Sequence, residues 1–215
     1  MKVIFLDVDG VLNSEKDLLN AKGDSEIFDR PLKLLKHLVD STKAKIVISS
    51  TWRIGCARSG RTSFYGEELY KTLEKRLADY QLEIFDITPV IVKPNIKRGD
   101  EIREWLKEAK HKYHIESFVI LDDESDMCEF TSTNLVQTSM ETGLTENHIL
   151  IAENILNINE QSVREKIEHH LFKIWDKRPE WRFGQLIVNI LGADPFYISD
   201  QIALEKILDY ERELQ

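Results

Sequence analysis

The chain has 215 residues, of which 42% are hydrophobic and 31% charged, a balance that is typical of a folded globular protein. Its net charge of −9 disfavours broad, sequence-independent binding to nucleic acid, although a local basic groove remains compatible with it. No apolar run is long enough to span a bilayer, so we expect no membrane partner. Aspartates interrupt the first apolar stretch, which argues against a signal peptide, and two isolated cysteines, Cys56 and Cys128, suit a cytoplasmic location.

The first predicted strand, residues 2–7, ends in two aspartates and a glycine. If the chain stays extended, Asp7 and Asp9 lie on the same side of it. Two converging carboxylates repel each other unless a cation or a shared proton lies between them, and hard oxygen ligands favour Mg²⁺ as that cation. A strand that runs into an ordinary Asp-Gly turn would give the same pattern without any chemical role.

Strand and helix patterns alternate along the first two-thirds of the chain. Further strands are predicted at 45–49, 83–86 with 90–92, 118–122 and 134–138. Helices are predicted at 30–42, 66–80, 98–111, 125–131 and 145–157. This alternation predicts parallel strands with right-handed crossovers, and therefore an α/β fold with three layers. The short stretch before the second strand has room for a flap at 13–29 and one helix, so we expect at most a minimal lid.

Three later segments place polar side chains at the ends of predicted elements. They are Lys45–Arg53, Lys97–Ile102 and Phe118–Asp126. In open α/β sheets, ligands collect beyond the carboxyl ends of the strands. We therefore expect Asp7, Ser49 and Asp122, which are distant in sequence, to meet in space.

The order Asp-x-Asp, Ser, Lys/Arg, Asp-Asp resembles the four-motif signature of the haloacid dehalogenase-like (HAD) phosphohydrolase superfamily, over residues 1–158. Four segments are similar in sequence to HAD domains associated with nucleic-acid repair proteins, namely "SSTWR", "RGDEIREWL", "ILDDESDM" and "TGLT". The resemblance implies a Rossmann-like parallel sheet with a minimal cap. It also implies a Mg²⁺-dependent phosphomonoester hydrolase that acts through an aspartyl-phosphate.

The resemblance assigns roles to the aspartates. Asp7 is expected to be the nucleophile and a metal ligand. Asp9 is expected to act as general acid and then as base, with its backbone carbonyl on the metal. Asp122 and Asp123 are expected to complete the metal site. Gly10 is expected to let the chain turn tightly and keep the strand end open to substrate.

Other residues are expected to hold the phosphate. Ser49, or less favourably Ser50, would hydrogen-bond a phosphoryl oxygen. Either Lys97 or Arg98 would neutralise the phosphate, and the sequence leaves this choice open. Arg53 follows the serine motif directly, so we expect it to contact a substrate phosphate. Asp126 is either an outer metal-site residue or the N-cap of the next helix.

The loop after the serine motif also carries Arg58, Arg61 and Trp52 near aromatic residues. Such a loop either grips a nucleotide or an oligonucleotide end or is an ordinary solvated loop, and Trp52 either stacks on a base or packs in the core. We expect a phosphorylated substrate, with a preference for nucleotides or polynucleotide terminal phosphates. Two alternatives are a non-catalytic HAD-fold scaffold and a phosphotransferase that acts on a small-molecule phosphate.

Residues 159–215 change character, because their apolar residues follow helical spacing and no strand pattern appears. The segment is similar to a small helical module of phage and bacterial proteins. We expect two domains, an HAD-like domain at 1–158 and a helical module at 159–215. The module is expected to serve in packing, or as a surface for a homodimer or a protein partner.

Overall fold

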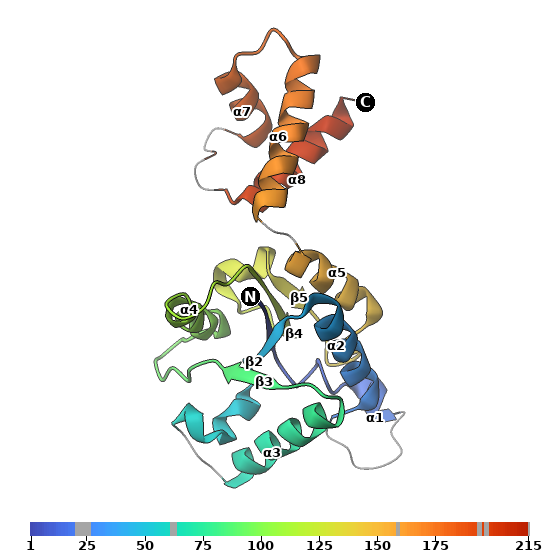
Figure 1. Cartoon of the computed structure of the whole chain (residues 1–215), viewed down its shortest axis with the longest axis vertical. Coiled ribbons are helices and arrows are strands. Elements are labelled where there is room, and N and C mark those ends of the chain that lie inside the picture. The colour runs from blue at the N-terminus through green and yellow to red at the C-terminus, as the bar shows by residue number, and fades with distance from the viewer. Residues whose placement is uncertain (20–26, 61–63, 158–159, 193–194, 196–197, 215) are drawn as a thin grey trace. The chain divides into compact units, whose positions relative to one another are not determined.

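The computed structural model describes residues 1–19, 27–60, 64–157, 160–192, 195 and 198–214. They form two compact units, of which the first is Met1–Asn157 and the second comprises the described residues from Glu160 onward. Figure 1 shows the helices and strands of both units.

The first unit is built on a five-stranded parallel sheet with the strand order β3-β2-β1-β4-β5. The strands are β1 Lys2–Leu6, β2 Lys45–Ile48, β3 Ile84–Ile87, β4 Ser117–Asp122 and β5 Leu135–Gln137. Leu6 at the end of β1 pairs with Ile48 on one side and Leu121 on the other. The residues that follow these three positions therefore leave the sheet at the same edge, which confirms the predicted α/β class.

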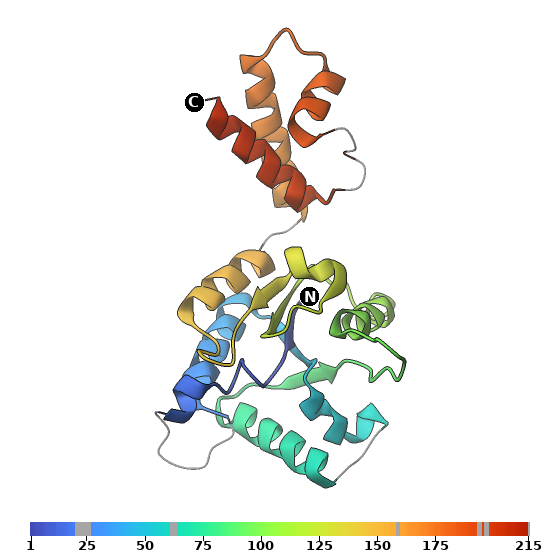
Figure 2. The same ribbon diagram turned by 180° about the vertical axis from the view of Figure 1, so that it is seen from behind.

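Alternate residues of the strands are buried on opposite faces of the sheet. Ile4 and Leu6 pack with the helices α2 (Asp29–Thr42), α3 (Phe64–Asp79) and α5 (Glu146–Asn157). Val3 and Phe5 pack on the other face, against α4 (Arg98–Ala109). Figure 1 and the reverse view in Figure 2 show α4 on one side of the sheet and α2 and α5 on the other, so the unit has three layers.

The helices α2 to α5 lie where the periodicity predicts them, but two other expectations were wrong. Residues 90–92 form no strand. The expected helix at 125–131 is replaced by a short 3₁₀ helix, Cys128–Ser132. Asp126, near the start of the expected helix, accepts from the backbone N–H groups of Arg98 and Gly99 at the beginning of α4. The expected flap contains a short helix, α1 (Glu15–Leu19), and its residues 20–26 lie outside the described part.

The second unit contains three helices, α6 (Glu160–Lys177), α7 (Phe183–Leu191) and α8 (Asp200–Glu213). Their shared core consists of the buried residues Leu171, Ile174, Leu186, Ile190 and Ile207. Ser199 caps α8, because its hydroxyl accepts from the backbone N–H of Ile202 at 3.3 Å. None of the helices in the described parts of the chain is both long and apolar enough to cross a membrane.

Candidate active site

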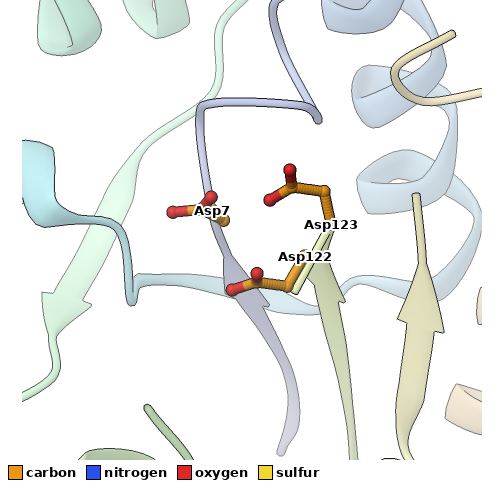
Figure 3. A group of neighbouring side chains, drawn as sticks. All are labelled: Asp7, Asp122 and Asp123. Carbon is orange, nitrogen blue, oxygen red and sulfur yellow. The ribbon is translucent and has the colours of Figure 1, made fainter. Parts of the chain in front are cut away.

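Three carboxylates meet beyond the ends of β1 and β4. Asp7, Asp122 and Asp123 each offer an oxygen, and these oxygens all lie within 4.8 Å of one another (Figure 3). Asp7 and Asp122 are buried, with 4% and 0% of their surfaces exposed, while Asp123 is half-buried. Buried carboxylates this close together require compensating positive charge.

The local backbone brings these side chains together. The Asp7 N–H donates to the carbonyl of Leu121 at 2.9 Å, which extends the β1–β4 pairing by one residue. Gly10 has a φ of +68°, and a Cβ atom at this position would lie 2.6 Å from Cγ of Asp123. Any other residue would therefore push Asp123 away. The absence of a side chain at Gly10 thus allows Asp123 to approach the other two carboxylates.

Arg98 supplies the positive charge between the carboxylates. Its Nη1 donates to Asp7 Oδ1 at 2.9 Å, and its Nε lies 3.4 Å from Asp122 Oδ2. Lys97 is exposed at the residue before α4, and its backbone N–H donates to Asp100. Of the two cations that the sequence left open, the structure thus places Arg98 in the site and Lys97 at its outside.

The electrostatics of the two buried carboxylates reflect this crowding. Burial raises the pKa of Asp7 above its ordinary value and the charge of Asp9 adds to the effect, while Arg98 and a hydrogen bond from Ser50 lower it. Burial and the neighbouring charge of Asp7 raise the pKa of Asp122 to about 7, although Arg98 opposes them. One arginine therefore does not fully compensate the negative charge that gathers here.

The donor set fits a hard divalent cation such as Mg²⁺. Oδ2 of Asp122 is buried and accepts no hydrogen bond from the described residues, although Nε of Arg98 forms an ion pair with it at 3.4 Å. A buried carboxylate oxygen without a hydrogen bond is costly, and Arg98 shares its single charge between Asp122 and Asp7, so the site can accept a further positive centre. Asp7, Asp122 and Asp123 offer only oxygen ligands, as Mg²⁺ prefers. The side chain of Asp9 is not part of this cluster.

Asp9 points its carboxylate toward a different set of partners. Its Oδ2 accepts from the indole N–H of Trp52 at 3.0 Å, and its Oδ1 accepts from the side-chain amide of Asn13 at 2.8 Å. The amide oxygen of Asn13 in turn accepts from the N–H of Gly10 at 3.0 Å. Both oxygens of Asp9 are thus held in place. Neither partner of Asp9 could be predicted from the sequence, apart from the closeness of Asn13 along the chain.

The two serines after β2 differ in their surroundings. The backbone N–H groups of Ser49 and Ser50 both donate to the carbonyl of Leu6, which fixes the loop beside β1. The Ser50 hydroxyl contacts Asp7 and accepts from the backbone N–H of Trp52. The Ser49 hydroxyl is buried without a hydrogen-bond partner in the described structure. Ser50 is therefore the serine whose hydroxyl lies at the nucleophile candidate.

Arg53 does not reach the open side of the site. Its guanidinium is buried and donates to the carbonyls of Ser49, Ser50, Thr88 and Pro89, and to the carboxylate of Glu101. Glu101 also accepts from the backbone N–H of Ile91 at 3.0 Å. With its donors used in this way, Arg53 ties the serine loop to α4 and to the segment after β3. This geometry does not support the expected contact with a substrate phosphate.

The remaining candidate residues have less structural definition. Arg61 lies outside the described residues, and only the backbone of Arg58 is described. Asp126 is neither a metal-site residue nor the cap of the helix expected after it. Instead its carboxylate accepts from the backbone N–H of Arg98 at 3.2 Å, at the start of α4. This contact holds the helix end from which Arg98 reaches Asp7.

Comparison with known proteins identifies the type of domain. Residues 3–149 match the family described as "HAD domain in Swiss Army Knife RNA repair proteins". Among solved structures, the chain is similar to D,D-heptose 1.7-bisphosphate phosphatase from B. bronchiseptica, complexed with magnesium and phosphate. This similarity has a TM-score of 0.47 and 18% identity, and covers 73% of this chain and 98% of that one. No curated protein sequence matches at a significant level.

Proposed function

The chain belongs to the family of HAD domains in Swiss Army Knife RNA repair proteins, and from this premise we propose that it is a Mg²⁺-dependent phosphomonoesterase. The observation that carries the proposal is the cluster of Asp7, Asp122 and Asp123, with Arg98 between the two buried carboxylates. The family match confirms the HAD assignment made from the four motifs. The catalytic roles of individual residues are part of the proposal.

In this proposal Asp7 is the nucleophile. Arg98 holds its Oδ1, which leaves the other carboxylate oxygen to attack phosphorus and form an aspartyl-phosphate. The arginine also lies where negative charge grows on the transferring phosphoryl group, so it stabilises the transition state. The hydroxyl of Ser50 is available to orient the same carboxylate or a phosphoryl oxygen.

Asp9 acts on the leaving alcohol. As general acid it gives its proton to the ester oxygen, and as general base it then takes a proton from the water that hydrolyses the aspartyl-phosphate. Trp52 and Asn13 hold its two oxygens and so fix its orientation. Asp7, Asp122 and Asp123 would hold Mg²⁺, which supplies charge neutralisation and orientation of the phosphate.

The proposed substrates are nucleotides or the terminal phosphates of polynucleotides. The family's occurrence in RNA repair proteins supports this choice. The net charge of −9 favours local contacts near one phosphate over broad binding along a nucleic acid. We also expect the protein to act in the cytoplasm, in keeping with its two free cysteines.

The second unit carries no residue of the proposed site. Phe172, Phe183 and Val188 are each about half exposed there, with 49%, 51% and 48% of their surfaces accessible. We propose this unit as a surface for a homodimer or a protein partner. Sedimentation of the full chain and of a Phe172→Ser, Phe183→Ser variant tests the homodimer. A concentration-independent monomer in both would count against it.

The proposed activity is tested with a panel of sugar phosphates, nucleoside monophosphates and oligonucleotides with 3′ or 5′ phosphates, assayed with Mg²⁺ and with excess chelator. Asp7→Asn is isosteric and should lower turnover by several orders of magnitude at an unchanged unfolding transition. Activity that survives in this variant, or in chelator, would exclude the mechanism. A wild-type protein that binds Mg²⁺ but hydrolyses nothing would favour the scaffold alternative. Transfer of phosphate to an added alcohol would favour the phosphotransferase.

A further inference from the structure

A hollow of about 550 Å³ opens beside Asp9, within the usual size range of small-molecule sites. Asp9 lines it, whereas Asp7, Asp122, Asp123 and Arg98 do not. The hollow therefore borders Asp9 without being lined by the carboxylate cluster. An acid that protonates the leaving oxygen has to lie next to the leaving group, so this hollow is where the alcohol part of a phosphate ester would extend.

The lining of the hollow is largely apolar and partly aromatic. Its apolar residues are Leu18, Phe28, Trp52, Tyr65, Leu69 and Met140. Three of these are strongly exposed, with 63% of Leu18, 68% of Tyr65 and 46% of Met140 accessible. Exposed large apolar side chains gathered around a concave surface indicate a binding site for an apolar or ring-shaped group.

The charges of the hollow restrict what it can hold. Among the described residues that line it, the ionisable ones are Asp9 and Glu15, and neither lysine nor arginine is present. A second phosphate in this position would face negative charge without a cation to neutralise it. The alcohol part of the substrate should therefore be uncharged where it lies in the hollow, which disfavours sugar bisphosphates.

The wall formed by α1 is fixed before any ligand binds. The carboxylate of Asp17 in α1 forms an ion pair with Arg30, with Nε 2.6 Å from Oδ1. Arg30 also donates to the carbonyls of Thr142 and Leu144, and the N–H of Glu15 donates to the carbonyl of Met140 at 2.8 Å. These contacts hold α1 against the segment that carries Met140. A preformed wall lowers the entropic cost of binding a rigid ring.

We propose that this hollow binds the nucleoside that carries the scissile phosphate, with the base stacked on Tyr65 and packed against Leu18 and Met140. This inference rests on the proposed function, because it takes Asp9 as the acid for the leaving oxygen. It adds the subsite that selects the substrate. Ring stacking explains the aromatic lining, and the neutrality of a base explains the absence of cations among its described residues.

The test compares Tyr65→Ala with the matched control Tyr113→Ala. Tyr113 is an exposed tyrosine of the same unit, 42% accessible, that does not line the hollow. Stacking of one base on an aromatic side chain is worth about 1–3 kcal/mol, so we expect kcat/KM of Tyr65→Ala for a nucleoside monophosphate to fall about fivefold or more. The loss on glycerol phosphate, which has no ring, should be at least about fivefold smaller by the same stacking energy. Tyr113→Ala should match wild type on both substrates.

An oligonucleotide substrate distinguishes the two possible sources of the nucleoside. If a free nucleotide is the substrate, an oligonucleotide with the same terminal phosphate should be turned over poorly. If a polynucleotide end is the substrate, it should be turned over well and show the same loss in Tyr65→Ala. Equal losses on the nucleotide and on glycerol phosphate, or no loss on either, would overturn the subsite while leaving the phosphatase proposal intact.

Binding of adenosine and uridine, measured by calorimetry, separates the two proposals. The subsite predicts that wild type and Asp7→Asn bind these nucleosides and that Tyr65→Ala binds them at least about fivefold more weakly. Such binding in a protein that hydrolyses no phosphate ester would refute the proposed activity and support the nucleoside subsite. A protein that hydrolyses phosphate esters but neither binds nucleosides measurably nor prefers ring-bearing esters would support the proposed activity and refute the subsite.

Discussion

Removing the guanidinium of Arg98 is the most direct test of the site. This side chain is 17% exposed, and its Nη1 donates to Asp7 at 2.9 Å and to the carbonyl of Ser49 at 2.8 Å. Its Nε lies 3.4 Å from Asp122. The adjacent Lys97 has the same charge but is exposed. Arg98→Ala and Lys97→Ala therefore form a matched pair that differs in position only.

The structure allows the size of the effect to be worked out. Breaking a buried ion pair by removing one partner costs about 3–5 kcal/mol. We expect the free energy of unfolding of Arg98→Ala to fall by about 3 kcal/mol, because Asp122, whose pKa is raised to about 7, can relieve part of the strain by taking a proton. Loss of one such electrostatic contact in a transition state lowers kcat by about 10²–10³-fold. Lys97→Ala should change either quantity very little.

Urea denaturation with and without Mg²⁺, together with steady-state kinetics, measures both effects. Mg²⁺ should restore part of the stability of Arg98→Ala, because the cation replaces positive charge beside the carboxylates. It should restore much less of the activity, since the guanidinium also contacts the phosphoryl group in the proposed mechanism. The reasoning is refuted if Arg98→Ala keeps turnover within about threefold of wild type, or if Lys97→Ala loses as much.

Three other predictions follow from single contacts. Trp52→Phe keeps an aromatic ring but removes the indole N–H that holds Asp9, so kcat should fall about tenfold, and an unchanged kcat would contradict the positioning role. Trp52 is buried, so the smaller ring also leaves a cavity, and the kinetics are measured well below the unfolding transition of the variant. Burial raises the pKa of Asp17, but hydrogen bonds from Arg30 and Ser14 more than offset this effect. The pKa of Asp17 in the folded protein therefore lies below its ordinary value of 3.8. Its stabilisation is therefore complete above about pH 4 and lost as pH falls through the folded-state pKa, and Asp17→Asn should cost about 1–3 kcal/mol in urea at pH 7 and progressively less as the pH falls below about 4. A chain truncated after Asn157 should retain turnover of a small phosphate ester, since the first unit holds the whole proposed site; a folded but inactive truncation would contradict this.

The fold class and the meeting of three motifs could be predicted from the sequence. Apolar runs of strand length alternate with helical patterns, and both patterns depend on neighbours within a few residues. Parallel strands expose their carboxyl ends at one edge of the sheet. For this reason Asp7, Ser49 and Asp122 could be placed near one another without coordinates. The register of Leu6 with Ile48 and Leu121 then bears out that geometric argument.

The residues that the sequence could not place are those whose partners lie far along the chain. Arg53 follows the serine motif, yet Glu101, 48 positions away, and four carbonyls bury its guanidinium. Asp126 was expected to be either an outer metal-site residue or the N-cap of the next helix, but its carboxylate accepts from the backbone N–H of Arg98 at the start of α4. Neither the contact of Glu101 with Arg53 nor that of α4 with Asp126 can be predicted from the local hydrophobic periodicity.

The choice between Lys97 and Arg98 shows the same limit most clearly. Both are cations at the start of one amphipathic helix, and successive helical residues point about 100° apart. Composition and motif spacing therefore do not show which of the two cations faces the carboxylates. Only the packing of α4 against the sheet, and the contact of Asp126 with its first turn, decide which one faces the carboxylates. The sequence determined which chemical groups gather at the sheet edge, and the tertiary structure determined which of them touch, because contact depends on orientations that distant parts of the chain impose.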